Sequence, residues 1–402
     1  MTRPLTANEN RSAFAVLSGT PMGLIAAYLL MIMSGAIVLR MPGATVRGNE
    51  MSLQRAVFTA VNAGTLTGFQ QSVGLDEYGP SGRACVLTLT IGGTLFVLIT
   101  GGIALVRLLR MPYTDGQIIR GAIFTYLFVV ACATAILADP ERGLLASASQ
   151  AAAAFGNSGL HLGKLPSATE GRTYFALLPL IVLGGFSIPV ILELFDVLFR
   201  RRGLSRHTVV VFSFTAGLYL IGVIALLPWH WSSDVATKLG SASTLSLDSR
   251  TSGLPFVTIS ALSRPAQWVL IVLMLIGASP AGAGGGMKVT ALFHLYRGTR
   301  SALNGERALR ITGIAWPWVG IYLLIVFLTL LGLLATVSEL PADRLVFLSA
   351  SAVSNVGLSY DPISFTGAGL MVMCLGMILG RVAPLLMLWW AALTTEDADV
   401  GV

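Results

Sequence analysis

Four short polar segments of the sequence share a pattern suited to holding a dehydrated cation. They read TAVNAGTLTGF (59–69), QAAAAFGNSGL (150–160), STLSLDSRTSGL (243–254) and SASAVSNVGL (349–358). Each has a stretch rich in Thr, Ser or Asn, then one glycine, then Phe or Leu; the glycines are Gly68, Gly159, Gly253 and Gly357. Rings of backbone carbonyls can replace the water around a monovalent cation without adding a charge. Glycine helps, because it reaches unusual backbone angles at no steric cost.

The composition places these segments in a membrane protein. Of the 402 residues, 54% are hydrophobic and only 11% are charged, whereas soluble domains carry about 25% charged residues. The three cysteines, Cys85, Cys132 and Cys374, lie in apolar stretches and show no CxxC spacing. The cysteines therefore indicate neither a disulfide framework nor a zinc site. The sequence therefore predicts an all-α membrane protein.

Eight uncharged stretches are long enough to cross a bilayer, which requires about 20 apolar residues in a helix. They are Ser12–Leu39, Ala84–Val106, Gly121–Ala138, Thr173–Leu192, Thr208–Ser233, Pro265–Met287, Ile311–Ser338 and Pro362–Gly380. Two other uncharged stretches, Ala56–Leu75 and Gly143–Gly163, begin as helices and end in polar residues and glycine. Backbone that leaves a helix inside the bilayer must be satisfied by protein or water. We therefore expect both to be re-entrant: a short helix followed by an extended return.

The glycine segments imply an internal repeat. Their glycines are 91, 94 and 104 residues apart, and each segment falls between two predicted spans. A unit of span, re-entrant loop and span returns the chain to its starting side, so four units point all their loops to one face. We expect one integral membrane domain over residues 1–402, with repeats of approximately 12–110, 115–202, 206–300 and 308–395. Eight transmembrane helices would then surround one pore with pseudo-fourfold symmetry. The alternative, that these are ordinary extracellular turns, does not explain four matching segments.

The basic residues predict the orientation, because cytoplasmic loops carry an excess of Lys and Arg. With the N-terminus inside, the inner segments hold 13 basic and 8 acidic residues, whereas the outer segments hold 11 of each. The inner basic residues are Arg3, Arg11, Arg107, Arg110, Arg120, Arg200, Arg201, Arg202, Arg206, Arg297, Arg300, Arg307 and Arg310. We expect both termini in the cytoplasm and the glycine segments facing outside.

Five motifs, three in the third repeat and two in the fourth, resemble the Trk/Ktr/HKT superfamily of potassium transporters. They are RTSGL (250–254) with MLIGASP (274–280), GGGMK (284–288), and SNVGL (354–358) with GRVAPL (380–385). The likeness covers residues from about 15 to 392. Eight spans without an additional hairpin resemble the Ktr-type membrane subunit more than the longer Trk type.

The resemblance implies a potassium selectivity filter lined by carbonyls at and just before the glycines. In this sequence the residues are Leu66, Thr67 and Gly68; Asn157, Ser158 and Gly159; Thr251, Ser252 and Gly253; and Asn355, Val356 and Gly357. In this superfamily glycine in the first loop goes with potassium selectivity and serine with sodium preference, so Gly68 favours potassium. His161 soon after the second glycine, and the stretch SPAGAGGGMK, depart from the usual pattern.

The sixth predicted span contains a proline and several glycines, which oppose a continuous helix. By resemblance this stretch forms a flexible gate below the filter. The gate residues would be Gly282, Gly284, Gly285, Gly286, Lys288 and Arg381. A cation within the bilayer suggests a function. Alternatively, the glycines serve tight helix packing, Lys288 extends to the inner interface, and Arg381 bonds loop carbonyls structurally.

The predicted function is potassium uptake across a bacterial inner membrane, with K⁺ as the transported ion, no bound cofactor and no enzymatic activity. The resemblance also implies a homodimer on a cytosolic nucleotide-binding ring that senses ATP/ADP or NAD, since this chain has no nucleotide-binding motif of its own; no nucleic acid is expected to bind. Transport of sodium, or of monovalent cations without selection, is the main alternative. A sodium-coupled carrier would more often show inverted repeats. A rhomboid-like protease using Ser158 in GNSGLH (156–161) would leave the other three glycine segments unexplained.

Overall fold

The computed structural model describes residues 21–45, 51–139, 143–200, 203–229, 234–305 and 310–396. The described residues form α-helices and loops and contain no β-strand, only isolated bridges. The helices are α2 (Pro21–Leu39), α3 (Leu53–Gly64), α4 (Pro80–Leu109), α5 (Asp115–Leu137), α6 (Leu144–Gly156), α7 (Leu178–Gly185), α8 (Ile188–Arg200), α9 (Arg206–Leu226), α10 (Val235–Thr251), α11 (Arg264–Leu275), α12 (Val289–Leu303), α13 (Arg310–Thr336), α14 (Ala342–Val353) and α15 (Ala368–Glu396). The predicted all-helical class is confirmed.

Six described helices, α2, α4, α5, α9, α13 and α15, are long and apolar enough to cross a membrane. A further apolar segment is a bent pair, in which α7 and its preceding turn meet α8 at 112°, the geometry of a broken span or a re-entrant loop. The predicted span Thr173–Leu192 is therefore not one straight helix. The break follows Gly184 and Gly185 at the end of α7. Pro189 lies in the first turn of α8, where the backbone N–H groups make no hydrogen bond within the helix, so proline is tolerated there.

The predicted span Pro265–Met287 is also interrupted. Helix α11 ends at Leu275, and helical structure resumes only with α12 at Val289. The intervening residues include the proline and glycines that opposed a helix in the sequence, so the expected break is observed. The beginning of the first predicted span, Ser12–Thr20, lies outside the described residues, as do Arg3, Arg11, Arg201, Arg202 and Arg307.

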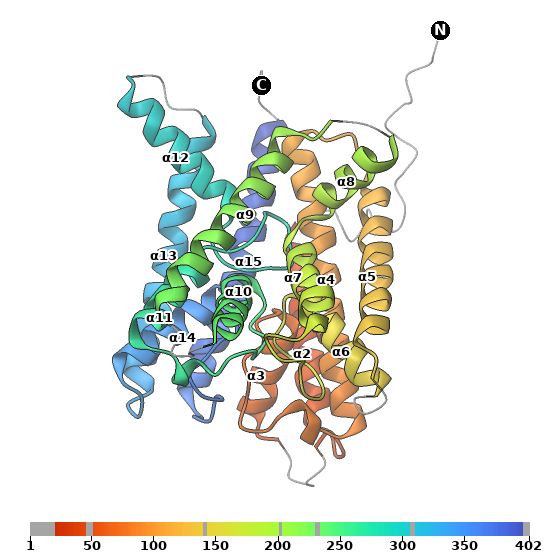
Figure 1. The fold of residues 1–402 in the computed structure, drawn as a ribbon, viewed down its shortest axis with the longest axis vertical. Helices are drawn as coiled ribbons and strands as arrows, with labels where there is room; N and C mark the ends of the chain where they lie inside the picture. Colours follow the sequence, from red (N-terminus) through yellow and green to blue (C-terminus); the bar gives the residue numbers. More distant parts are fainter. Residues whose placement is uncertain are drawn as a thin grey trace.

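The short helices α3, α6, α10 and α14 each lead into one of the four glycine segments. Helices α3 and α6 each give way to a non-helical return, as expected for Ala56–Leu75 and Gly143–Gly163. In Figure 1, α3, α6 and α14 lie toward one end of the molecule, and α8 and α12 lie toward the other.

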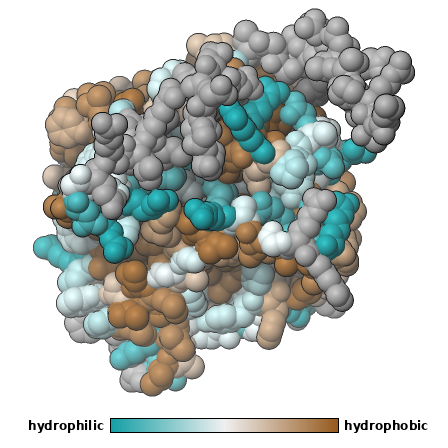
Figure 2. Space-filling model, turned by 90° about the horizontal axis from the view of Figure 1, so that it is seen from above, coloured by the Kyte–Doolittle hydropathy of each residue, from teal (hydrophilic) through white to brown (hydrophobic). Residues whose placement is uncertain are grey.

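Two long helices form the centre of the bundle and four form its outer surface. The most apolar part of α4 is 72% buried and that of α15 is 50% buried, whereas in α2, α5, α9 and α13 only 22–28% is buried. The outer helices expose large apolar side chains, including Leu30, Phe124, Ile224 and Phe327. Such an apolar belt suits a lipid environment. Figure 2, which views the end where α8 and α12 lie, shows hydrophilic side chains among the hydrophobic ones there.

The bend after α7 requires a glycine at its packed face. A Cβ at Gly184 would collide with the carbonyl of Phe155, in the last turn of α6, while a Cβ at Gly217 in α9 would meet no atom within 4 Å. We expect Gly184→Ala to destabilise the purified protein by about 1–3 kcal/mol, as overpacking does. Gly217→Ala should be neutral or slightly stabilising. Thermal unfolding in detergent measures both, and equal midpoints for the two variants would contradict this account of the bend.

Candidate functional site

The four glycines meet in a closed ring. A Cβ at Gly68 would collide with the backbone of Gly159, and a Cβ at Gly159 would collide with the carbonyl of Gly253. A Cβ at Gly253 would collide with the carbonyl just before Gly357, and a Cβ at Gly357 with the carbonyl just before Gly68. Each glycine thus touches the next segment in chain order and the fourth touches the first. Residues as far apart in the sequence as Thr67 and Gly357 pack main chain against main chain.

Three of the four segments enter this ring through the same turn. At the ends of α3, α6 and α14, two consecutive N–H groups donate backward along the chain. The first donates to the carbonyl three residues before it, and the second donates to the carbonyl five residues before it. In the first segment these bonds are Leu66 to Ala63 (3.1 Å) and Thr67 to Asn62 (3.0 Å). The same pair recurs at Asn157 and Ser158, and again at Asn355 and Val356. This is the Schellman arrangement that ends many helices.

The pivot of each turn is a residue with left-handed backbone. Leu66, Asn157 and Asn355 have φ of 60°, 52° and 49°. Asparagine tolerates this region, whereas a leucine there is strained by roughly 1–2 kcal/mol. Gly68 and Gly357, two residues later, both have φ of 87°, which explains the requirement for glycine in these two segments.

The third segment takes a different path into the ring. The predicted filter residue Thr251 is the last residue of α10 and is helical. The carbonyl of Asp248 accepts the N–H groups of both Ser252 (3.0 Å) and Gly253 (3.4 Å), so the turn closes one residue later than in the other segments. The carboxylate of the buried Asp248 accepts bonds from the Ser252 hydroxyl and the Leu254 N–H.

Buried amide side chains hold the first and fourth segments in place. The side-chain oxygen of Asn62 accepts the N–H groups of Gly68 and Phe69, each at 2.9 Å, and its amide donates to the Phe69 carbonyl. The amide of Asn355 donates to the Thr67 hydroxyl (3.0 Å) and to the Met377 carbonyl in α15 (2.9 Å). These bonds satisfy turn N–H groups through side chains, and they tie two of the segments together and to a central helix.

Residues 276–288, here called the gate stretch, form a buried loop directly against this ring. Its base is closed by bonds from Gly277 N–H to Met287 (2.9 Å) and from Met287 N–H to Leu275 (3.0 Å). A Cβ at Gly285 would collide with the Ser354 carbonyl, just before the fourth filter triplet. At its far side, the Ala283 N–H bonds the Gly184 carbonyl at the α7 bend (2.9 Å).

Both predicted gate cations contact this stretch. Arg381, buried in α15, donates from Nε to the Thr65 carbonyl (2.8 Å) and from Nη1 to the Ala283 carbonyl (2.6 Å). It thus bridges the end of α3 and the gate stretch. Lys288 donates from Nζ to the Gly284 carbonyl (2.6 Å), within the loop that it terminates. Six predicted gate residues therefore lie together.

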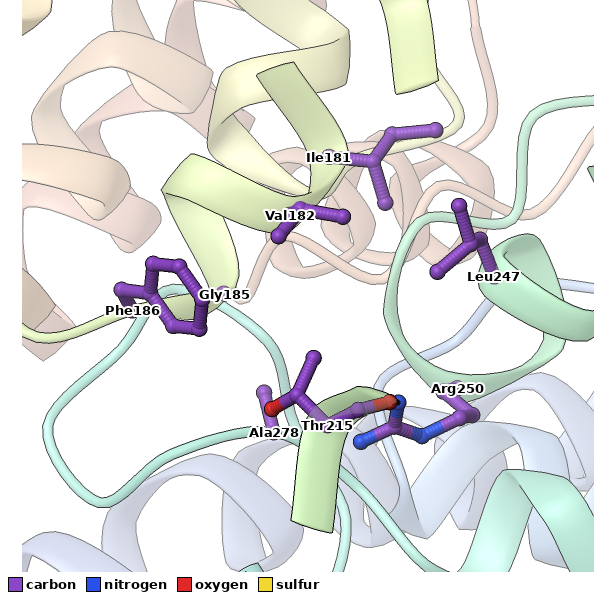
Figure 3. Close-up of a pocket in the computed structure, with 8 residues that line it drawn as sticks. All are labelled: Ile181, Val182, Gly185, Phe186, Thr215, Leu247, Arg250 and Ala278. Carbon is purple, nitrogen blue, oxygen red and sulfur yellow. Dashed lines mark hydrogen bonds between the residues drawn. The ribbon is translucent and has the colours of Figure 1, made fainter. Parts of the chain in front are cut away.

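A buried arginine, to which the sequence pattern assigned no role, lies directly before the third triplet. Arg250 donates to the carbonyls of Thr215 in α9 (3.3 Å) and Gly277 at the base of the gate stretch (3.0 Å). Figure 3 shows its guanidinium beside Thr215 and Ala278, at a cavity between α7, α9 and α10. Asp248 and Arg250 are charged residues buried inside the helical bundle, and that signal marks a functional candidate in a membrane protein.

The geometry does not assemble a serine nucleophile at Ser158. This residue is fully buried, and its hydroxyl has no hydrogen-bond partner among the residues that the structure describes. The Nδ1 atom of His161 approaches the Leu162 carbonyl at 3.5 Å. A protease would need a base within hydrogen-bond reach of the hydroxyl.

Comparison with known proteins finds curated relatives over most of the chain. No family model matches the sequence. The chain is 24% identical to the Ktr system potassium uptake protein B of Vibrio alginolyticus, covering 93% of this chain and 91% of that protein. It is 26% identical to the protein of the same name from Bacillus subtilis, covering 94% of each. The resemblance to the Trk/Ktr superfamily is confirmed.

A solved Trk structure agrees with the fold. The crystal structure of the potassium transporter TrkH from Vibrio parahaemolyticus superposes with a TM-score of 0.74 at 16% identity, and the match covers 98% of this chain and 87% of that one. The chain therefore has a TrkH-like helical fold. The six membrane-length helices among the described residues agree with this fold. It is a multi-pass membrane protein.

Proposed function

We propose that this protein takes up potassium through a filter formed by the ring of glycine segments. The carrying observation is the closed contact of Gly68, Gly159, Gly253 and Gly357, which brings backbone carbonyls from four segments to one place. Backbone carbonyls coordinate a monovalent cation without holding it as tightly as carboxylates would. The named activity of the Ktr relatives, potassium uptake, supports this function and speaks against an enzyme.

The filter in this proposal consists of the four triplets 66–68, 157–159, 251–253 and 355–357. We further propose that four repeats, each a span, a pore helix and a second span, surround one axis with approximate fourfold symmetry. The shared turn at the ends of α3, α6 and α14 supports this arrangement. The carboxyl ends of these helices would face the ion, and their partial negative charge favours a cation.

The gate in this proposal is the buried stretch 276–288, which obstructs the path next to the filter. Arg381 would hold the obstruction in place, because its guanidinium bonds both the gate stretch and the first pore helix. The same positive charge opposes passage of a cation while the gate is closed.

In the cell we propose a bacterial plasma membrane protein with both termini in the cytoplasm and the filter open to the outside. A homodimer on a cytosolic nucleotide-binding ring would regulate the gate; the name Ktr system of the relatives supports a multi-component assembly. Sodium is the competing cargo, because another relative, NtpJ of Enterococcus hirae, is named a potassium/sodium uptake protein and is 25% identical over 90% of this chain.

The first prediction concerns uptake and its selectivity. Proteoliposomes containing the chain, with its regulatory subunit if required, should accumulate rubidium. Gly68→Ser should lower the ratio of rubidium to sodium uptake by at least about fivefold, because a side chain at φ of 87° is strained by about 1–3 kcal/mol and pushes against Gly159.

The matched control for this experiment is Gly74→Ser. Gly74 has φ of −69°, and a Cβ there would meet no atom within 4 Å, so its ratio should equal that of the wild type. Absent rubidium influx, or influx whose ratio is the same in the Gly68 variant, rules out this filter.

The second prediction concerns the gate. Arg381→Met removes both bonds to the Thr65 and Ala283 carbonyls, so the gate stretch should loosen and rubidium flux should rise several-fold with little change in selectivity. Arg344→Met is the control, since Arg344 pairs with Asp361 at an exposed site away from the gate. Flux that stays constant while selectivity changes would contradict the gate assignment, and a thermal unfolding scan of each variant reports on folding.

A further inference from the structure

The side chain of Gln70 reaches back onto the filter ring. Its amide nitrogen donates to the Gly159 carbonyl at 2.8 Å and lies 3.5 Å from the Gly68 carbonyl. These are the carbonyls of two of the four ring glycines. A donor already occupies an acceptor position that the proposed function gives to the transported ion.

Gln70 and the gate stretch contact different parts of the glycine segments. The gate stretch contacts the residues that precede the glycines, Thr65 through Arg381 and Ser354 directly. Gln70 follows its glycine by two residues. In the proposed orientation, an ion entering from the outside would meet the Gln70 amide before it meets the gate.

The main chain around Gln70 is held by hydrogen bonds, so a displacement from the ring is expected of its side chain. The Gln70 carbonyl accepts the Ile363 N–H at 2.9 Å, and the Asn62 side chain holds the preceding residue, Phe69, by its N–H and its carbonyl. The side chain of Gln70 lines a recess together with, among others, Gln71, Leu160 and His161. Gln70 itself is half-buried at this recess.

The adjacent glutamine points elsewhere. The amide of Gln71 donates to the hydroxyl of Thr59 in α3 at 3.0 Å, and its oxygen lies within bonding distance of the same hydroxyl. Successive residues of an extended segment project to opposite sides. The chain thus supplies two neighbouring glutamines, of which only Gln70 contacts the ring.

We propose that the Gln70 amide occupies the outermost ion position of the filter and gives way when a cation enters. An N–H group and a cation compete for the same carbonyl lone pairs, and the positive end of the amide dipole opposes the incoming charge. Gln70 therefore weakens the apparent affinity for external potassium and is an affinity-determining residue. This inference rests on the proposed function, since it assumes that the ring is the filter.

The test is the concentration dependence of rubidium uptake by the full-length protein in proteoliposomes. Gln70→Met keeps most of the side-chain volume and removes the donor. Its KM should fall by about 2- to 10-fold, the fold-change that one hydrogen bond of ordinary strength provides, without a rise in the sodium to rubidium ratio. Gln70→Glu, which adds a negative charge at the same place, should lower KM at least as far.

Gln71→Met is the matched control and should keep the wild-type KM. If Gln70 merely braces the first and second segments, Gln70→Met will raise KM and admit more sodium, and that result overturns the proposal. An unchanged KM overturns it as well. Gln70→Ala replaces the methionine variant should the latter fail to fold, with the same expected direction.

The experiments distinguish a failure of the proposed function from a failure of the role proposed for Gln70. If the wild-type protein takes up no rubidium, the proposed function is wrong. If the wild type transports rubidium and responds to Gly68→Ser, but Gln70→Met leaves KM unchanged or raises it, only the role of Gln70 is wrong.

Discussion

The contact on which this structure depends is main chain against main chain among four glycines. No side chain fits between them, because each Cβ would collide with the backbone of the next segment. Four helices from distant parts of the sequence must therefore end close to one point, with their following segments in direct backbone contact. The central helices α4 and α15, the short helices and their turns can all be understood as the scaffold for that contact.

Inside an apolar bundle these positions are held by hydrogen bonds from buried polar side chains. Asn62 satisfies two N–H groups of the first segment, Asn355 joins the fourth segment to the first, and Asp248 performs a related role in the third. Unpaired polar groups in such surroundings cost roughly 1–3 kcal/mol each. Arg250 and Arg381 extend the same network to the gate stretch through bonds to its carbonyl groups.

The sequence predicts much of the fold because membrane burial leaves strong local signals. Long uncharged stretches mark the outer helices, and the proline and glycines of residues 280–286 correctly predict the interruption before Val289. The repeated glycine segments predict where four loops meet. The 112° bend after α7 was not anticipated, because Gly184 and Gly185 are ordinary in membrane helices, and only the collision with the Phe155 carbonyl shows why they are needed.

The finer details of the site depend on contacts between distant residues, which no local pattern contains. Arg381 joins three parts of the chain by donating hydrogen bonds to the carbonyls of Thr65 and Ala283. Arg250 does the same through the carbonyls of Thr215 and Gly277. The third segment resembles the others in its amino-acid sequence, yet its turn closes one residue later because Thr251 remains helical. Gln70 and Gln71 are adjacent residues of the same type, and they differ in their contacts: Gln70 bonds the Gly159 carbonyl and Gln71 bonds the Thr59 hydroxyl.

The most direct test of a carbonyl-lined filter is to locate the ion. Crystals grown or soaked in thallium, a heavy monovalent cation of nearly potassium size, should show anomalous density enclosed by Gly68, Gly159, Gly253 and Gly357. Potassium should displace this density at lower concentration than sodium does. Thallium density absent from the ring but present elsewhere in the bundle would contradict the account.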